Sequence, residues 1–177
     1  PPVREQGKFD ATVDTLISIG DVTLTGSSAV QINVKSGSLM STTLSLPANV
    51  NVLGLTSPAL RIYDVIKNNV IKNGNPSGEP GNQLIKVEYT REMKGQFRMD
   101  INYERIMTED MSTVNVPTLT AVGAEVEHGR LAIEALAAVE IKATQSDQLT
   151  TVEVGELPRQ LILKTTNPIL LAYRYVN

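Results

Sequence analysis

Residues 84–104 read LIKVEYTREMKGQFRMDINYE, and this stretch decides the fold class of the chain. Polar and apolar residues alternate on both sides of Lys94-Gly95-Gln96, and the apolar ones stand at odd positions: Val87, Tyr89, Phe97, Met99, Ile101 and Tyr103. Successive side chains of a strand point to opposite faces, so a period of two predicts strands with one buried and one solvated face. The stretch predicts an antiparallel β domain and contains no recognisable chemistry.

We expect the glycine in the middle of this stretch to form the loop of a β-hairpin. Residues that face each other across a hairpin share a face of the sheet, so odd positions must oppose odd positions. A two-residue turn at Lys94-Gly95 would set Tyr89 against Asp100, whereas a three- or five-residue loop keeps the parity. The pattern therefore predicts an odd-length loop, with Tyr89 opposite Ile101 if the loop has three residues.

The first half of the chain shows the same alternation, interrupted by turn residues roughly every 8 to 12 residues, which is typical of a sandwich or meander. We expect turns at Gly20-Asp21, Gly26-Ser27-Ser28 and Gly37-Ser38. The segments expected to be strands are 8–19, 22–24, 30–34, the stretch containing Leu44 and Leu46 that ends at Pro47, and the stretch containing Leu60 and Ile62.

One long loop is expected at residues 73–82, where proline and glycine resist both helix and strand. It forms the tip of a long hairpin, or it divides two subdomains. We favour the hairpin tip, which makes residues 1–177 a single β-rich domain. The alternative is two β subdomains divided near residues 72–82.

The second half contains one ambiguous segment and one helix signal. Residues 130–141 have high helix propensity, but their alternation favours strands. Glu156-Leu157-Pro158 resembles a helix start, because proline is tolerated in the first turn, so we expect one short helix near 157–163. A short edge strand is expected at Val114–Val116 and a largely buried strand at Ile169–Val176. The fold class is thus mainly β, an antiparallel β-sandwich with one short helix.

Composition removes several classes of function. The chain has 177 residues and no cysteine, which excludes disulfides, thiol catalysis and thiolate metal sites. Its formal charge is −3, too balanced for steering toward nucleic acid or an anionic membrane. No apolar run approaches the ~18 residues that span a bilayer, so we expect no membrane insertion by this segment. The chain begins Pro1-Pro2-Val3, without a signal-like stretch, so we expect a fragment or a processed form.

A set of short motifs that follow strand and turn rules is spread over roughly residues 40 to 176: Leu46-Pro47 with Val50, Val52 and Leu53, Val87-Glu88-Tyr89, Gly95-Gln96-Phe97, Val114-Asn115-Val116-Pro117, Gly129–Ala135, Val152-Glu153-Val154, Glu156-Leu157-Pro158 and Leu170–Tyr173. Through these motifs the chain resembles a β-sandwich module of large, uncharacterised bacterial cell-envelope proteins. The resemblance implies an extracytoplasmic β-sandwich inside a larger, membrane-tethered protein. It transfers no catalytic or binding residue.

His128 is the one histidine of the chain and the first candidate for a metal ligand or an acid–base group. Glu125 or Glu127 would have to assist it. Strand alternation puts Glu127 on the opposite face, and Gly129 indicates a turn. We therefore expect His128 in a surface loop. A Ser-His-Asp triad would need this same residue, and no Gly-x-Ser-x-Gly elbow is present.

Carboxylates elsewhere give no clearer site. Asp10 and Asp14 share a strand face with Thr12, and a carboxylate pair can serve a glycosidase, but outward strand positions are commonly charged. Glu109-Asp110 falls in an expected loop. The 73–82 loop has one carboxylate and two prolines, unlike a calcium loop, and it lacks the pattern of a phosphate-binding loop. The sequence assigns no catalytic, cofactor-binding or metal-ligating residue.

Basic residues on the expected hairpin could indicate nucleic acid. Acidic residues between them cancel most of the field, so we expect a solvated face with cross-strand ion pairs and no nucleic-acid partner. The basic residues are Lys86, Arg91, Lys94, Arg98 and Arg105, and the acidic ones are Glu88, Glu92, Asp100 and Glu104.

The leading hypothesis is a non-catalytic structural or interaction module of a larger cell-envelope protein, on the periplasmic or extracellular side. It would bind a protein partner, or itself, through strand edges or loops at one end of the sandwich. A first alternative is a virion or phage structural β domain of a capsid or tail. A second is a carbohydrate-binding module, which the absence of tryptophan disfavours. An enzyme is the weakest class.

Overall fold

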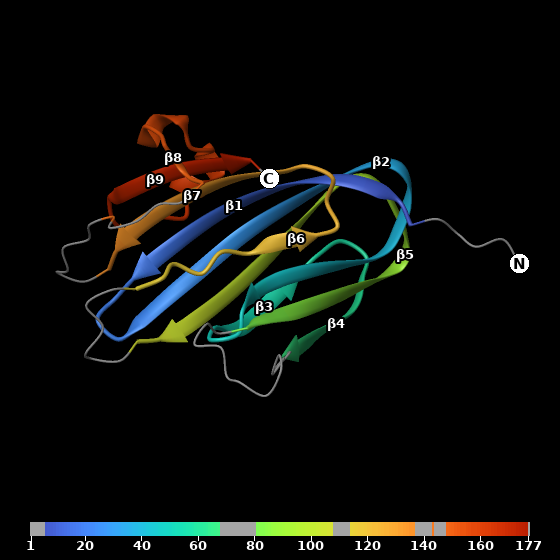
Figure 1. Cartoon of the computed structure of the whole chain (residues 1–177), viewed down its shortest axis with the longest axis horizontal. Helices are drawn as coiled ribbons and strands as arrows, with labels where there is room; N and C mark the ends of the chain where they lie inside the picture. Colours follow the sequence, from blue (N-terminus) through green and yellow to red (C-terminus); the bar gives the residue numbers. More distant parts are fainter. Residues whose placement is uncertain (1–5, 68–80, 108–113, 137–142, 144–147, 177) are drawn as a thin grey trace, which may run out of the picture.

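The computed structural model describes residues 6–67, 81–107, 114–136, 143 and 148–176. They form a mainly β fold with one short helix, as the sequence predicts (Figure 1). The strands are β1 (Lys8–Ile19), β2 (Thr23–Pro47), β3 (Asn51–Thr56), β4 (Leu60–Lys67), β5 (Asn82–Ile106), β6 (Thr120–Val122), β7 (Glu127–Ala135), β8 (Thr150–Thr151) and β9 (Ile169–Val176). A 3₁₀ turn (Val154–Glu156) precedes the helix α1 (Arg159–Ile162).

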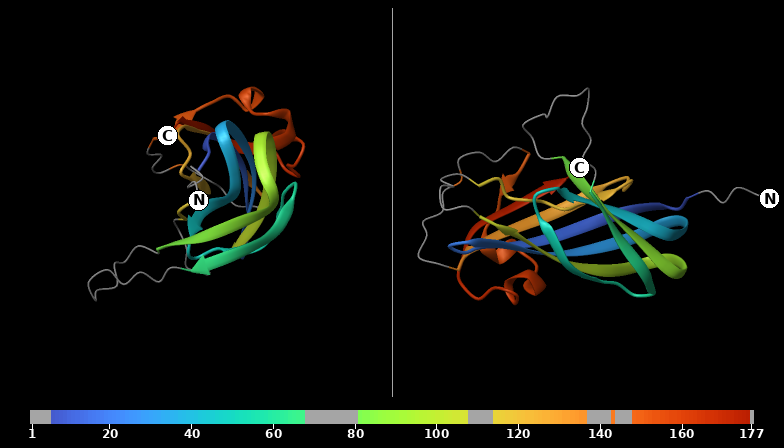
Figure 2. Two further views of the ribbon diagram at one scale, coloured as in Figure 1. Left: turned by 90° about the vertical axis from the view of Figure 1, so that its right-hand side faces the viewer. Right: turned by 90° about the horizontal axis from the view of Figure 1, so that it is seen from below.

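Two strands of 25 residues, β2 and β5, pair with each other along most of their length. Both bend near the middle, where Gly37 has φ 69° and Gly95 has φ 68°. Each long strand therefore passes from one layer of a β-sandwich into the other, which is visible as the curl of the ribbons in Figure 2. Residues 23–34 of β2 pair with 95–106 of β5, and residues 39–47 pair with 82–93.

The large layer has the strand order β8-β9-β7-β1-β2-β5-β3 and uses the first half of β2 and the second half of β5. The small layer consists of the other halves of these two strands, flanked by β6 next to β2 and by β4 next to β5. Pairing is antiparallel except between β1 and β7, which run parallel. The predicted antiparallel β-sandwich is confirmed as a mostly antiparallel one, with this single parallel pair as the exception among the described strands.

The predicted hairpin at Lys94-Gly95-Gln96 is wrong. Gly95 bends β5 without reversing it, because β2 bends at the matching place and keeps β5 paired on both sides. The alternation itself is correct, since Val87, Tyr89, Phe97, Met99, Ile101 and Tyr103 are all buried. The bend folds the strand over its own side chains, so Tyr89 meets Phe97 edge-on with ring centroids 5.3 Å apart.

Two other predicted turns are also wrong. Residues 26–28 and 37–38 lie inside β2. Gly26 is required because the Tyr103 ring covers it: a Cβ there would lie 2.1 Å from a ring carbon. Gly37 supplies the positive φ of the bend, a conformation that L side chains rarely adopt. Gly26 therefore makes room for a ring and Gly37 allows the strand to bend, whereas the sequence pattern predicted a reversal of the chain at both.

Among the remaining predictions, strands at 8–19 and in the Leu60 segment, and the end of β2 at Pro47, are confirmed. The 130–141 segment is strand through Ala135, and α1 lies within the predicted 157–163 range. Val114–Val116 is not a strand; these residues pack on the core without a ladder, and the strand β6 follows at Thr120. β9 is buried mainly at Ala172 and Tyr173 and is otherwise more exposed than predicted.

Two predictions fall partly outside the described residues: the 73–82 loop, which is described only from Gly81, and residues 137–141 of the ambiguous 130–141 segment. Glu109-Asp110 also lies outside them. The strands on either side of the 73–82 loop pair in antiparallel fashion, with Lys67 opposite Gln83.

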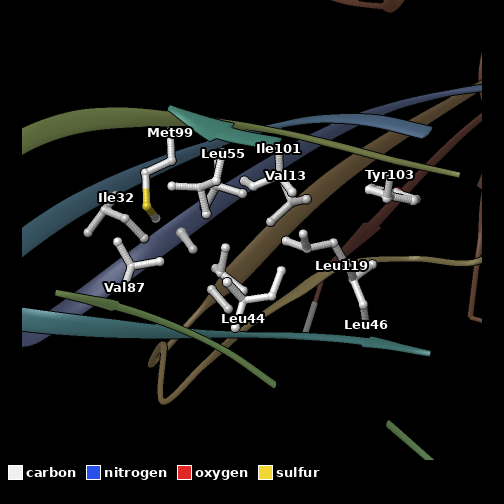
Figure 3. Packing of buried hydrophobic residues seen from close by; sticks show 14 of the residues in the cluster. Val13, Ile32, Leu44, Leu46, Leu55, Val87, Met99, Ile101, Tyr103 and Leu119 are labelled. Carbon is white, nitrogen blue, oxygen red and sulfur yellow. The ribbon is translucent and has the colours of Figure 1, made fainter. Parts of the chain in front are cut away.

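The main core fills the space between the two layers. Figure 3 shows Val13, Ile32 and Met99 of the large layer with Leu44 and Val87 of the small layer. A second, smaller cluster lies on the outer side of the large layer, where the α1 segment covers part of the sheet. Its buried members are Leu16, Ala132, Leu157, Leu161 and Ala172.

Candidate interaction surfaces

His128 lies on β7 with an exposed side chain, so the surface prediction is right and the loop prediction is wrong. Gly129 is no turn residue, because it stays in the strand beneath the Tyr175 ring, where a Cβ would meet a ring carbon at 1.9 Å. Glu127 points to the opposite face, as alternation predicts, and is buried. Its carboxylate accepts hydrogen bonds from the Ala121 amide (2.7 Å) and from the Tyr175 hydroxyl (2.9 Å).

Burial, and secondly the Glu127 carboxylate, raise the pKa of Tyr175 far above its usual range. The tyrosine therefore stays protonated near neutral pH and donates a hydrogen bond to Glu127. The two side chains are hydrogen-bonded to each other inside the protein. Neither is a candidate for acid–base chemistry on a ligand.

Glu134 is a second buried carboxylate, and its burial was not predicted from the sequence. Its Oε1 accepts a hydrogen bond from the Ser18 hydroxyl at 2.7 Å. Its Oε2 accepts from the backbone amides of Thr166 and Asn167, both at 3.0 Å. Glu134 thus holds the segment that follows α1 against the sheet, and its role is structural.

The outer side of the large layer contains a polar hollow of about 390 Å³. The register of the strands arranges its lining side chains in rows across the sheet. Asn33 lies opposite Asp10 and Gln96. Thr12 lies opposite Gln31 and His128, and Asp14 lies opposite Arg130. Pro158 and Gln160, from the α1 segment, form one wall. The site residues named from the sequence, His128, Asp10 and Asp14, are therefore brought together on one face.

The charged groups of the hollow are paired within the protein. Arg130 Nε lies 3.2 Å from Asp14 Oδ1, and Lys35 Nζ lies 3.2 Å from Asp10 Oδ1 and 2.6 Å from a Glu125 oxygen. Partial burial raises the pKa of Asp14, and Arg130 counteracts that shift. Since each carboxylate already has a cation, Asp10 and Asp14 do not form the free pair that glycoside hydrolysis needs.

The α1 wall is fixed to the sheet by polar contacts from β5. Arg98 donates to Gln160 Oε1 and also forms an ion pair with Asp100, with a nitrogen–oxygen distance of 2.8 Å. Lys164 lies 3.7 Å from the same carboxylate and 3.3 Å from the Ser27 hydroxyl. The position of the wall therefore does not depend on the small apolar cluster alone.

The second candidate surface is the free edge of β4, at the lower margin of the molecule in Figure 1. Among the described elements β4 forms a ladder with β5 only. Leu60 and Tyr63 pack on the core, whereas Ile62, Val65 and Ile66 are 48%, 38% and 45% exposed. An exposed edge with apolar side chains is a template for pairing with another strand.

Basic and acidic residues are interleaved on β5, as predicted, and their ion pairs lie both within the strand and across to β4. Lys86 and Arg98 form ion pairs with Glu88 and Asp100, two positions along the same strand, so these pairs are not cross-strand. Arg61 of β4 reaches Glu88 across the ladder at 3.8 Å. Acidic and basic groups thus alternate along this face.

Within the described residues, no three histidine, cysteine or acidic side chains gather in a way that could hold a metal ion. The same residues contain no helix long and apolar enough to cross a membrane.

No protein-family model matches the chain, and no curated protein matches it in sequence. Among solved structures it is similar to a non-cellulosomal cohesin from the hyperthermophilic archaeon Archaeoglobus fulgidus, with 10% identity and a TM-score of 0.36. The match covers 71% of this chain and 91% of the cohesin. Function must therefore be inferred from the chain's own side chains.

Proposed function

We propose that this chain is a non-catalytic interaction module, part of a larger protein of the cell envelope, and that β4 is its binding edge. The observation that carries the proposal is the combination of a strand edge that no described residue pairs with and exposed side chains of Ile62, Val65 and Ile66. Strand addition gives affinity through main-chain hydrogen bonds and specificity through alternate side chains. A protein partner that contributes one extended segment fits this edge.

The charges on β4 favour a different protein over a second copy of the chain. Antiparallel pairing of two β4 strands that opposes Ile62 to Ile66 must also oppose Asp64 to Asp64 and Arg61 to Lys67. Like charges directly opposite each other destabilise a strand pair. Self-pairing is therefore penalised in the one register that matches the exposed apolar side chains.

The same positions specify the complementary strand. In antiparallel pairing it would carry acidic residues opposite Lys67 and Arg61, a basic residue opposite Asp64, and apolar residues between them. The seven-residue peptide Glu-Ile-Val-Lys-Val-Ile-Glu has this pattern. Its charge-reversed form, Lys-Ile-Val-Glu-Val-Ile-Lys, has the same apolar residues and opposes like charges at all three positions.

Titration of these two capped peptides into the labelled chain, followed by amide chemical shifts, tests the binding edge. We expect the first peptide to shift amides of β4 and the charge-reversed peptide to bind at least several-fold more weakly. The double variant Ile62→Lys, Ile66→Lys should lose the response. The variant Leu53→Lys, an exposed apolar residue on β3, should keep it. Equal binding of both peptides, or shifts away from β4, would refute the proposal.

Native mass spectrometry separates this proposal from the virion or phage alternative. An interaction module that awaits a different partner stays monomeric, because its binding edge resists self-pairing. A capsid or tail subunit forms rings or lattices. Closed rings of the wild-type chain that the Ile62→Lys, Ile66→Lys variant cannot form would favour the alternative.

A further inference from the structure

The polar hollow on the large layer offers free hydrogen-bonding side chains, and its charged groups are already in ion pairs. The side chains of Thr12, Asn33 and His128 line it, and no side-chain hydrogen bond or ion pair joins them to another described residue. Asp14 pairs with Arg130, and Asp10 pairs with Lys35, which also pairs with Glu125. A charged ligand would therefore have to displace an existing ion pair, whereas a neutral polar ligand would not.

The spacing of these groups follows from the sheet. Neighbouring strands lie about 4.8 Å apart, and side chains on one face of a strand recur about every 7 Å. Thr12 and His128 are direct neighbours across the β1–β7 pair, and Asn33 belongs to the next row on β2. The hollow thus presents a two-dimensional array of donors and acceptors. Such an array suits a ligand that carries several hydroxyl groups on a rigid frame, because each hydroxyl both donates and accepts.

The lining excludes other classes of ligand. Among the described residues the only apolar members are Ala11 and Pro158, so an apolar ligand would find little surface to bury. The three carboxylates of Asp10, Asp14 and Glu125 outnumber the two cations Lys35 and Arg130, so the hollow disfavours anions. The volume of about 390 Å³ lies near the lower end of the range for small-molecule sites. These properties together point to one or two sugar residues.

We propose that this hollow binds a neutral saccharide, with Thr12, Asn33 and His128 as its hydrogen-bonding contacts. Recognition by polar groups on a flat strand surface does not need the tryptophan platform whose absence disfavours a carbohydrate-binding module on sequence grounds. The site lies on the outer face of the large layer, whereas the β4 edge belongs to the small layer. The two sites are independent, and the chain can bind a glycan and a protein at the same time.

The single histidine provides a direct test, because the Cε1–H signal of its imidazole has no counterpart from another histidine and reports on the hollow. Titration with glucose, galactose, mannose, N-acetylglucosamine and their common disaccharides should shift this signal saturably for at least one sugar. The double variant Thr12→Val, Asn33→Ala should bind that sugar roughly tenfold more weakly, since each lost hydrogen bond has a modest effect. Thr90→Val, on an exposed position of β5, should bind it normally.

Three outcomes overturn the proposal: no sugar in the panel shifts the signal, the double variant binds as well as wild type, or inorganic phosphate competes. The Ile62→Lys, Ile66→Lys variant keeps its hollow intact and should still bind the sugar. Failure at the hollow with normal peptide binding at β4 refutes the saccharide site alone.

Discussion

A tyrosine ring covers a glycine at two places in the large layer: Tyr103 over Gly26, and Tyr175 over Gly129. In both cases the two residues are direct cross-strand partners. The glycine leaves room for the ring to lie flat on the neighbouring strand, and the ring covers backbone that a glycine leaves exposed. The tyrosine hydroxyls then reach inner polar groups, Ser28 in one case and Glu127 in the other.

We expect Gly129→Ala to destabilise the protein by about 1–3 kcal/mol, because the added methyl group overlaps the Tyr175 ring and forces it away. Urea unfolding measures the change. Gly54→Ala is the matched control, since Gly54 is also in a strand and a Cβ there meets nothing within 4 Å. Equal effects of the two substitutions would mean that the ring contact does not matter.

Burial on the outer face of the large layer was difficult to predict from the sequence. The alternation rule assigns Leu16, Ala132 and Ala172 to the solvated face, yet all are buried under the α1 segment. The sequence does contain a signal, because each of them adjoins an apolar residue on the inner face, as in Leu16-Ile17 and Leu131-Ala132-Ile133. Unbroken apolar runs in neighbouring strands indicate a sheet covered on both sides. Glu134 had no such signal, since its partners are backbone amides distant in sequence.

At the scale of elements, the positions of most strands could be predicted, whereas the continuity of β2 and β5 through their glycines could not. Alternation located β1, β4, β5 and β7 because it depends only on which face is buried. Several predicted turns were wrong because glycine has three roles in this protein. Gly20 lies where the chain reverses, Gly26 lets the Tyr103 ring approach the strand, and Gly37 and Gly95 allow the strands to bend. Which use applies depends on the neighbouring strand. The polar hollow could not be predicted for the same reason, because only the register between neighbouring strands places His128 beside Thr12.

The bend of β5 can be tested at Gly95. It has φ 68°, and a Cβ there would meet nothing within 4 Å, so only backbone strain opposes a side chain. We expect Gly95→Ala to cost roughly 1–2 kcal/mol, and Gly95→Asn to cost clearly less because asparagine tolerates the left-handed conformation. Chemical denaturation compares the two variants. The same loss for both would mean that the bend does not require the positive φ.

At the scale of the molecule, the two layers share one core and the long strands β2 and β5 run through both. We propose that the whole chain is one domain and unfolds as a unit. Leu44→Ala in the small layer should then lower hydrogen-exchange protection in β7 and β9 as much as in β2, by about 2–5 kcal/mol. Val13→Ala, its counterpart in the large layer, should likewise weaken the small layer. Protection that falls only in the mutated layer would indicate two subdomains.

The parallel pairing of β1 with β7 has a consequence for synthesis. Among the strands of this sheet β1 is made first, yet it lies in the interior of the large layer, and one of its sides stays unpaired until Glu127 and the residues after it have been made. Most of the chain must therefore exist before the sheet can close. Folds dominated by such distant pairings form slowly and expose unpaired strands meanwhile, so a nascent chain of this kind depends on protection from aggregation.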